Sequence, residues 1–103
     1  MVFKIPISVL VVIYTPDKQV LMLERADHPG WWQSVTGSQN GGESLAETAA
    51  REVREETGLD VHAFRLEDWG YSNRYEIYAC YRHRYPSDVS HNTEHVYGLE
   101  VPQ

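Results

Sequence analysis

The sequence predicts a single α+β domain in which a mixed β-sheet packs against one long helix. Three observations predict this class. Residues 7–14 are rich in β-branched side chains, residues 44–58 carry the start and stop signals of a helix, and residues 75–85 alternate apolar with polar side chains. The 103 residues contain no internal repeat and no linker, so we expect one domain over residues 1–103.

The amino-terminal third is predicted to begin with a β-hairpin. Ile7–Tyr14 (ISVLVVIY) indicates a buried strand, Thr15-Pro16-Asp17-Lys18 is typical of a turn, and residues 19–23 (QVLML) return as a second strand. A loop at residues 27–30 then leads into a short strand or extended segment at residues 31–36. A loop with three glycines follows at residues 37–42.

The helix has the clearest signals in the chain. Ser44, with Glu47 three residues later, forms a capping box, which satisfies two amides at the start of a helix. Gly58 is placed to end the helix in a left-handed conformation. A narrow apolar stripe, expected to face the sheet, consists of Ala46, Ala49, Ala50 and Val53. Further strands are predicted at residues 63–68, 75–85 and 95–101.

Composition excludes several classes of protein. The net charge of −6 predicts no broad basic surface, so we expect no nucleic-acid partner. Cys80 is the only cysteine, which rules out an internal disulfide, fits a reducing compartment and indicates a small buried apolar residue. The apolar run of residues 5–14 is too short to span a bilayer and lacks a cleavage site. We therefore expect no membrane association and a cytoplasmic location.

Three glutamates share one face of the predicted helix. Glu52 and Glu56 are one turn apart, and Glu55 lies beside them at i+3 from Glu52. Like charges at this spacing destabilise an isolated helix by a few tenths of a kcal/mol, roughly. A divalent cation would relieve the repulsion, and hard oxygen ligands on a rigid helix suit Mg²⁺, for which Mn²⁺ could substitute.

A solvated helix face, with Arg51 and Arg54 as pairing partners, is the simpler interpretation of the glutamates alone. Such a face could also serve only as a protein-interaction surface. Neither interpretation requires a glycine-rich loop at residues 37–42, an isolated Glu43, or an arginine at a fixed distance from both. The whole pattern therefore favours a functional site.

The segment from Gly37 to Leu59, G-x5-E-x7-R-E-V-R-E-E-T-G-L, resembles the Nudix box at every specified position. The resemblance implies a Mg²⁺-dependent Nudix hydrolase that cleaves a phosphoanhydride bond of a small-molecule substrate on an α/β/α sandwich. It also implies metal ligation by Glu52, Glu55, Glu56 and the Gly37 carbonyl. Arg51 would orient this cluster by pairing with a glutamate such as Glu43, and the general base would be Glu55 or a later residue such as Glu94.

Stretches outside the box are similar to one group of this family, the dihydroneopterin triphosphate pyrophosphatases of folate synthesis; they are residues 7–14, 20–23, 32–38, 82–85 and 92–94. The similarity implies release of pyrophosphate from that triphosphate. A flat pterin ring needs an aromatic slot, for which Trp31, Trp32 and Tyr81 are candidates. Arg82 and Arg84, on one face of a predicted strand, could meet the triphosphate.

Each of these residues also has a plainer interpretation. Trp32 could be a core residue and Trp31 a surface aromatic, while Arg82 or Arg84 could be a solvent-exposed charge. Two other functions share the box: a hydrolase of oxidised or noncanonical nucleoside triphosphates, and a catalytically silent nucleotide-binding domain. Because family domains continue with a C-terminal helix, we expect a truncated or naturally short chain with weak turnover, whose uncovered sheet face favours a homodimer or aggregation.

Overall fold

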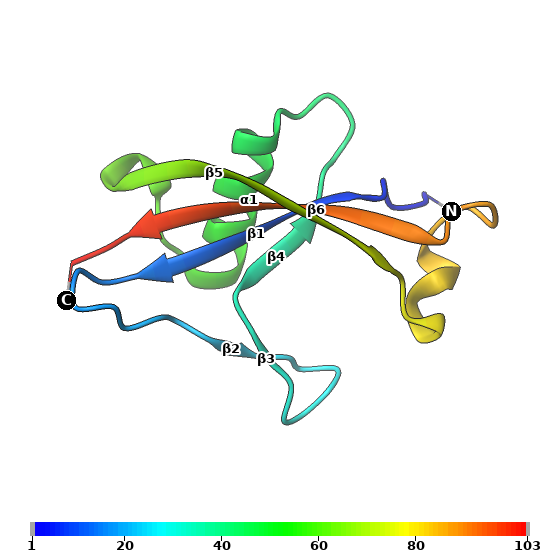
Figure 1. Cartoon of the computed structure of the whole chain (residues 1–103), viewed down its shortest axis with the longest axis horizontal. Helices are drawn as coiled ribbons and strands as arrows, with labels where there is room; N and C mark the ends of the chain where they lie inside the picture. The colour runs from blue at the N-terminus through cyan, green and yellow to red at the C-terminus, as the bar shows by residue number, and fades with distance from the viewer. Residues whose placement is uncertain (1, 103) are drawn as a thin grey trace.

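The computed structural model describes residues 2–102, which are built around a four-stranded sheet (Figure 1). The strand order is β4-β1-β6-β5, with bounds Val35–Ser38, Ile7–Tyr14, His91–Glu100 and Arg65–Glu76. β1 runs parallel to β6, whereas the β1–β4 and β5–β6 pairs are antiparallel. The predicted mixed sheet is therefore confirmed, and β1 has the predicted bounds.

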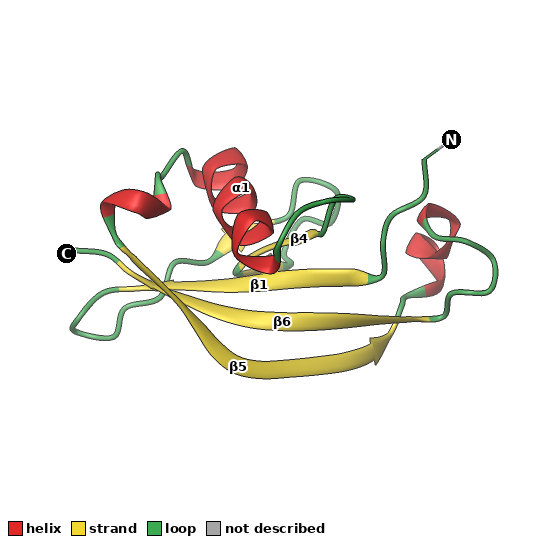
Figure 2. Ribbon diagram, turned by 90° about the horizontal axis from the view of Figure 1, so that it is seen from above, coloured by secondary structure: helices red, strands yellow, loops and turns green. Residues whose placement is uncertain are grey.

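Helix α1 (Leu45–Thr57) lies across one face of this sheet, as Figure 2 shows. The Ser44 side chain accepts a hydrogen bond from the Glu47 amide, and the Glu47 carboxylate accepts one from the Ser44 amide, at 3.1 and 2.8 Å. Gly58 ends the helix with φ of 79°. The predicted capping box and left-handed cap are both present.

The core lies between α1 and the sheet. Its buried members are Val9, Val11, Ile13, Val35, Ala49, Val53, Val61, Tyr97 and Leu99. Alternate residues of β1 reach this core because successive side chains of a strand point to opposite faces. The predicted apolar stripe of the helix was wrong at Ala46, which is exposed, while Thr48 is buried.

The predicted second strand at residues 19–23 is wrong. The chain makes one bridge, between Tyr14 and Val20, and then leaves the sheet. Val20 and Leu21 stay 48% and 40% exposed, so there is no buried face to favour a second strand there. Instead β2 (Leu23–Glu24) pairs with β3 (Trp32–Gln33) in a separate two-stranded hairpin, and the predicted segment at residues 31–36 divides between β3 and β4.

The predicted strand at residues 75–85 is also wrong. β5 continues only to Glu76, and two 3₁₀ segments flank it, η1 (Val61–Ala63) and η2 (Ala79–Arg84). Of the alternating apolar residues from 75 to 81, only Ile77 is buried. The alternation therefore does not mark a half-buried strand face. Cys80 lies in η2 and is exposed, contrary to the sequence prediction.

The last strand begins earlier than predicted. β6 starts at His91 rather than at residue 95, and Asn92 is 1% exposed within the sheet. On β6, Gly98 is covered by the Trp69 ring, which a Cβ at this position would meet at 2.1 Å. Within residues 2–102, α1 is the only α-helix, and no helix there is long and apolar enough to cross a membrane.

Candidate active site

The second half of α1 and the end of β4 bring the predicted acidic cluster together. Gly37 lies on β4 against the Glu52 side chain, and a Cβ at position 37 would be 2.0 Å from the Glu52 carboxyl carbon. Any side chain there would occupy the place of the carboxyl group. The glycine that opens the sequence pattern therefore allows Glu52 to lie directly on the strand.

Arg51 organises the acidic residues around it. Its Nε and Nη2 donate to the two Glu43 carboxylate oxygens at 2.7 and 3.1 Å, and Nη2 also donates to the Ser38 carbonyl at 2.9 Å. Its Nη1 donates to Glu52 at 2.7 Å and to Glu55 at 3.3 Å. These contacts use all five donors of a guanidinium, so Arg51 has no donor left for another ligand.

Glu43 is the anchor of this arrangement. Besides Arg51, it accepts hydrogen bonds from the Asn40 amide at 2.8 Å and from the Thr48 hydroxyl at 3.0 Å. The Arg51 hydrogen bonds, followed by the Asn40 amide, lower the pKa of Glu43 to about 2. Glu43 therefore stays charged at neutral pH, and its contact with Arg51 is the pairing that the family resemblance implied.

Glu52 and Glu56 form a close carboxyl pair. Partial withdrawal of the Glu56 carboxyl from water, followed by the Glu52 carboxyl within hydrogen-bond reach, raises the pKa of Glu56 to about 7, while the Thr36 backbone opposes this. Two adjacent carboxylates stay charged together only when a cation neutralises them. The pair therefore fits a divalent cation held between the two carboxylates.

Glu55 stands apart from this pair. Its side chain is 57% exposed and contacts Arg51 only at 3.3 Å. Within residues 2–102, no three side chains of the His, Cys, Asp and Glu types converge on one point as a ready metal site. The donor set thus fits a cation held by two carboxylates, and Glu55 would have to turn inward to join them.

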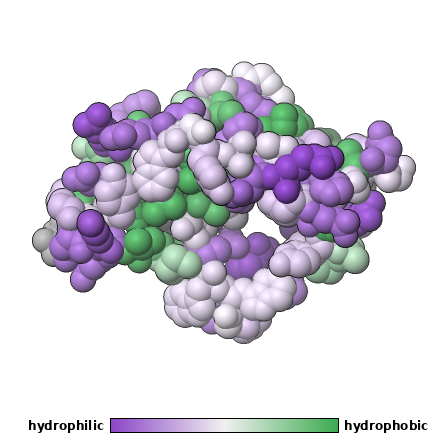
Figure 3. Space-filling view, in the orientation of Figure 1, coloured by the Kyte–Doolittle hydropathy of each residue, from purple (hydrophilic) through white to green (hydrophobic). Residues whose placement is uncertain are grey.

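A cavity of about 860 Å³ opens beside the carboxyl pair, and Figure 3 shows the hollow between the β2–β3 hairpin and the residues around η2. One part of its lining is acidic, with Glu52 and Glu56. Another is basic, with Lys4, Arg25 and Arg84, and a third is aromatic, with Trp31, Tyr78 and Tyr81. Opposite charges on facing parts of one cavity suit a ligand that carries several phosphates and a ring.

The basic residues of the cavity lining interact with one another and with nearby carboxylates. Burial, followed by Arg84, lowers the pKa of Lys4, whereas the negative charge of Glu52 raises it. Arg25 is bound by Asp27 through its Nε and Nη2 at 2.8 and 2.7 Å. Lys4 and Arg25 carry no motif that distinguishes them from other surface cations, so sequence analysis missed both.

The aromatic candidates separate in the structure. Trp31 and Tyr81 line the cavity, and Trp31 stacks on His28 with centroids 4.2 Å apart. Trp32 is 59% exposed and lies outside the lining, so it is neither in the slot nor in the core. Because η2 is not a strand, Arg82 and Arg84 do not share a strand face: Arg84 lines the cavity, and exposed Arg82 does not.

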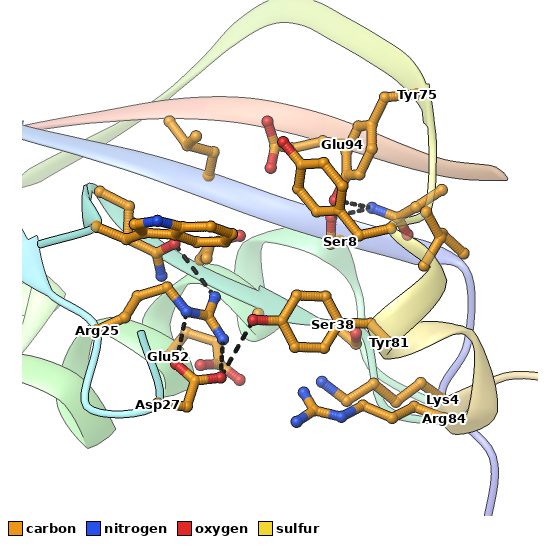
Figure 4. Close-up of a pocket in the computed structure, with 18 of the residues that line it drawn as sticks. Lys4, Ser8, Arg25, Asp27, Ser38, Glu52, Tyr75, Tyr81, Arg84 and Glu94 are labelled. Carbon is orange, nitrogen blue, oxygen red and sulfur yellow. Dashed lines mark hydrogen bonds and ion pairs between the residues drawn. The ribbon is translucent and has the colours of Figure 1, made fainter. Parts of the chain in front are cut away.

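A polar end of the cavity was also missed by sequence analysis. The Asn92 side-chain amide donates to the Ser8 hydroxyl at 2.7 Å and to the Tyr75 hydroxyl at 3.1 Å. Figure 4 labels Ser8 and Tyr75 at this end of the cavity. Glu94 lines the same cavity, and burial raises its pKa while the Thr36 hydroxyl lowers it. These residues meet only because β1, β5 and β6 are neighbours in the sheet.

Comparisons with known proteins agree on one family. The family model described as "NUDIX domain" matches residues 4–101. The dihydroneopterin triphosphate diphosphatase of Escherichia coli strain K12 is 48% identical over 104 residues, which cover 98% of this chain and 69% of the relative. The enzyme of the same name from Haemophilus influenzae is 44% identical over 97 residues, or 91% of this chain and 61% of the relative.

Solved structures give the same result. The structure of the E. coli dihydroneopterin triphosphate pyrophosphohydrolase superposes with a TM-score of 0.92 at 46% identity, covering all of this chain and 73% of the other. A NUDIX hydrolase structure from Listeria monocytogenes superposes with a TM-score of 0.77 at 25% identity, covering 94% of this chain and 64% of the other. The fold of this chain is therefore similar to the fold of both solved structures.

Proposed function

This chain belongs to the NUDIX domain family, and from that membership we propose that it hydrolyses dihydroneopterin triphosphate to the monophosphate and pyrophosphate. The acidic box, the mixed sheet and the names of its relatives support a hydrolase of phosphoanhydride bonds. The observation that carries the proposal is the Glu52–Glu56 carboxyl pair facing the basic lining of one cavity. Release of pyrophosphate requires both regions, one at the reacting phosphorus and one for the departing phosphates.

Members of this family generally use divalent metals, and we propose Mg²⁺, with Mn²⁺ as a substitute. Glu52 and Glu56 would hold the ion with the Gly37 carbonyl, and Glu55 would be either a further ligand or the general base. When bound, the ion screens the phosphate charge and acidifies a water molecule. Arg51 keeps Glu52 in place through its 2.7 Å contact, which is itself fixed by Glu43.

Two carboxylates of this chain could accept the proton of the attacking water. Glu55 is exposed at the rim of the cluster, and Glu94 lines the cavity on β6. Separate Glu55→Gln and Glu94→Gln variants assign this role. The base is the residue whose replacement lowers kcat by about 10²–10⁴-fold while Mg²⁺ affinity is unchanged.

The ring would enter the aromatic part of the cavity beside Trp31, because this indole lines the cavity and is held by His28. Pterin and guanine rings share flat faces and similar hydrogen-bonding edges. A purine triphosphate is therefore the alternative substrate. The homodimer, the lack of nucleic-acid binding and the cytoplasmic location stay predictions.

The decisive experiment is a panel of triphosphates with Mg²⁺, in which pyrophosphate and orthophosphate are measured separately. We expect pyrophosphate from dihydroneopterin triphosphate, no turnover after chelation, and a loss of several orders of magnitude in Glu56→Gln. Faster hydrolysis of a purine triphosphate would move the assignment to that substrate. Binding without any turnover in the wild type would instead identify a silent nucleotide-binding domain.

A further inference from the structure

The Tyr75 hydroxyl is a hydrogen-bond donor at the polar end of the cavity. The two N–H groups of the Asn92 side chain donate to the Ser8 hydroxyl at 2.7 Å and to the Tyr75 hydroxyl at 3.1 Å. An amide nitrogen does not accept, so both hydroxyl oxygens are acceptors here and each hydroxyl keeps its own proton for another partner. Ser8 is 5% exposed, whereas Tyr75 is 43% exposed and lines the cavity. Tyr75 is therefore the residue of this pair whose proton can reach a ligand.

Asn92 holds this hydroxyl in one arrangement. Its side chain is 1% exposed, and its carbonyl oxygen is buried without a hydrogen-bond partner among residues 2–102. Turning the amide over would bury two N–H donors without partners in place of one carbonyl, so the observed orientation is the less costly one. The Tyr75 oxygen is therefore an acceptor within the protein, and its proton is left for a ligand.

Tyr75 stays protonated at neutral pH, as a donor must. Burial raises the pKa of Tyr75 above its ordinary value of 10.0, the hydrogen bond from Asn92 lowers it, and the negative charge of Glu94 raises it. The net change in the pKa is upward. The phenol therefore keeps its proton throughout the range in which an enzyme of this kind works.

Glu94 places an acceptor beside this donor. It lines the same cavity and stands opposite Ser8 in the β1–β6 register, while Tyr75 stands opposite Asn92 in the β5–β6 register. Figure 4 shows Tyr75, Ser8 and Glu94 together at one end of the cavity. Within residues 2–102 Glu94 forms no ion pair, so its charge disfavours a phosphate at this end. The polar end therefore suits an uncharged group that has an acceptor next to a donor.

We propose that Tyr75 and Glu94 recognise the lactam edge of the substrate ring, which consists of the adjacent C=O and N–H groups that pterin and guanine share. Tyr75 donates to the ring oxygen, and the Glu94 carboxylate accepts the neighbouring ring N–H. A ring with an amino group and an unprotonated nitrogen at these positions, as in adenine, presents donor and acceptor in the reverse order and is rejected.

The inference rests on the proposed function, because it assigns recognition of the ring to one end of the same cavity. It limits the substrate class to triphosphates that carry an oxo ring, whether pterin or guanine. Glu94 then binds the ring, which leaves Glu55 as the carboxylate that accepts the proton of the attacking water.

The test compares two triphosphates that differ only at this edge. They are GTP and the diaminopurine analogue of GTP, in which an amino group replaces the ring oxygen and the neighbouring nitrogen loses its proton. Binding to metal-free protein is measured by calorimetry, so that no hydrolysis occurs and the identical sugar and phosphates contribute equally. In wild type we expect GTP to bind about tenfold more tightly than the analogue, the discrimination typical of a site with matched hydrogen bonds.

Tyr75→Phe removes the hydroxyl and keeps the ring. We expect the ratio of the two affinities to fall by about fivefold to tenfold, because GTP loses a hydrogen bond that the analogue never made. Tyr71→Phe is the matched control, since Tyr71 lies on the same face of β5, is 60% exposed and lies outside the cavity lining. Its ratio should stay within about twofold of wild type. Equal ratios in the two variants would reject the role of Tyr75.

Glu94→Gln separates ring binding from proton transfer. A glutamine amide both donates and accepts, so it suits either ring, and the ratio of affinities should fall by about fivefold in metal-free protein. Glu100→Gln is the control, because Glu100 is exposed at the end of the same strand and lies outside the cavity lining. A residue that served only as the general base would lower kcat and leave this ratio unchanged.

The outcomes distinguish this inference from the function on which it rests. If wild type releases pyrophosphate from dihydroneopterin triphosphate while Tyr75→Phe keeps the wild-type ratio, the recognition of the ring edge is rejected and the hydrolase stands. If the ratio falls in Tyr75→Phe but wild type hydrolyses no triphosphate, the recognition stands and the hydrolase is rejected. Wild type that binds both triphosphates equally, or binds neither, would also reject the recognition of the ring edge.

Discussion

At the scale of single residues, Arg51 and Glu43 form a fixed support for the flexible acidic side chains. Arg51 contacts three carboxylates and one carbonyl, whereas the Glu43 carboxylate receives hydrogen bonds from three residues. The Glu52 carboxyl is thereby held while the neighbouring Glu56 carries a raised pKa. The strong Arg51–Glu43 pair thus helps the fold to tolerate two repelling carboxyl groups, Glu52 and Glu56, side by side.

The lowered pKa of Glu43 predicts how stability depends on acidity. The folded-state pKa is about 2 against an ordinary 4.5, so its contribution is complete above 4.5 and is lost as the pH falls towards 2. Glu43→Gln should remove this part of the acid dependence of the urea midpoint. Glu67→Gln is the control, since Glu67 pairs on the surface with an Arg65 side chain that is 81% exposed. An equally steep acid dependence in Glu43→Gln would contradict the prediction.

Gly37 predicts a separation of activity from stability. In Gly37→Ala the new Cβ would coincide with the Glu52 carboxyl, which is the end of a flexible side chain and can move away. We expect Mg²⁺ affinity and turnover to fall by at least about tenfold, while unfolding changes by less than about 1 kcal/mol. Gly41→Ala is the control, because nothing lies within 4 Å of its Cβ position. Equal activity of the two variants would show that the close approach is not needed.

At the scale of elements, α1 is defined by local signals that act within a few residues. Its capping box and its left-handed end are made by Ser44, Glu47 and Gly58, all within one turn of the helix ends. Its acidic face, by contrast, depends on contacts with β4 and with the loop before the helix. The helix could therefore be predicted from sequence, but the setting of its glutamates could not.

The cap predicts a loss of stability that leaves the site unchanged. Ser44→Ala removes the hydrogen bond that the Glu47 amide donates to the Ser44 hydroxyl, which typically costs about 1 kcal/mol. For a domain of this size that corresponds to a fall of roughly 4–8 °C in Tm, measurable by circular dichroism. Exposed Ser87 lies in a turn, so Ser87→Ala should leave Tm unchanged. Similar Tm values for the two variants would contradict a stabilising cap.

Strand prediction failed where exposure outweighs local preference. Residues 20–22 are apolar yet 40–48% exposed, and three tyrosines in and next to η2 line the cavity: Tyr78, Tyr81 and Tyr85. An apolar–polar alternation in the sequence is typical of a strand with one buried face. The same alternation also occurs where the apolar side chains line a cavity, and the sequence does not distinguish the two cases. For this reason Arg82 and Arg84 were paired in the prediction and are separated in the structure.

At the scale of the whole molecule, the cavity exists because segments distant in sequence meet at one end of the sheet. Lys4 precedes β1, Arg25 follows β2, and Arg84 ends η2, yet all three line one space opposite Glu52. The β1–β6 and β5–β6 pairs bring Ser8, Tyr75 and Asn92 to the same place. The cavity therefore depends on sheet topology, not only on the sequence pattern of residues 37–59.

Burial in the core predicts how much stability the domain loses when a side chain is shortened. Leu99 is fully buried among the core residues of β1 and α1, so Leu99→Ala should cost about 2–5 kcal/mol in urea unfolding. Leu21→Ala is the control with the same chemistry, because Leu21 is 40% exposed. It should cost less than about 1 kcal/mol. Equal losses would mean that burial does not set the cost.

The sequence by itself determined the family, the helix and the acidic cluster, because spacing along one helix and its preceding loop encodes them. It also determined the first strand, because residues 7–14 form a continuous run rich in β-branched side chains. Tertiary structure alone decided which cations and aromatic side chains line the cavity. These residues come from separate loops, whose positions depend on long-range strand pairing and on burial. No local pattern of residues carries that information.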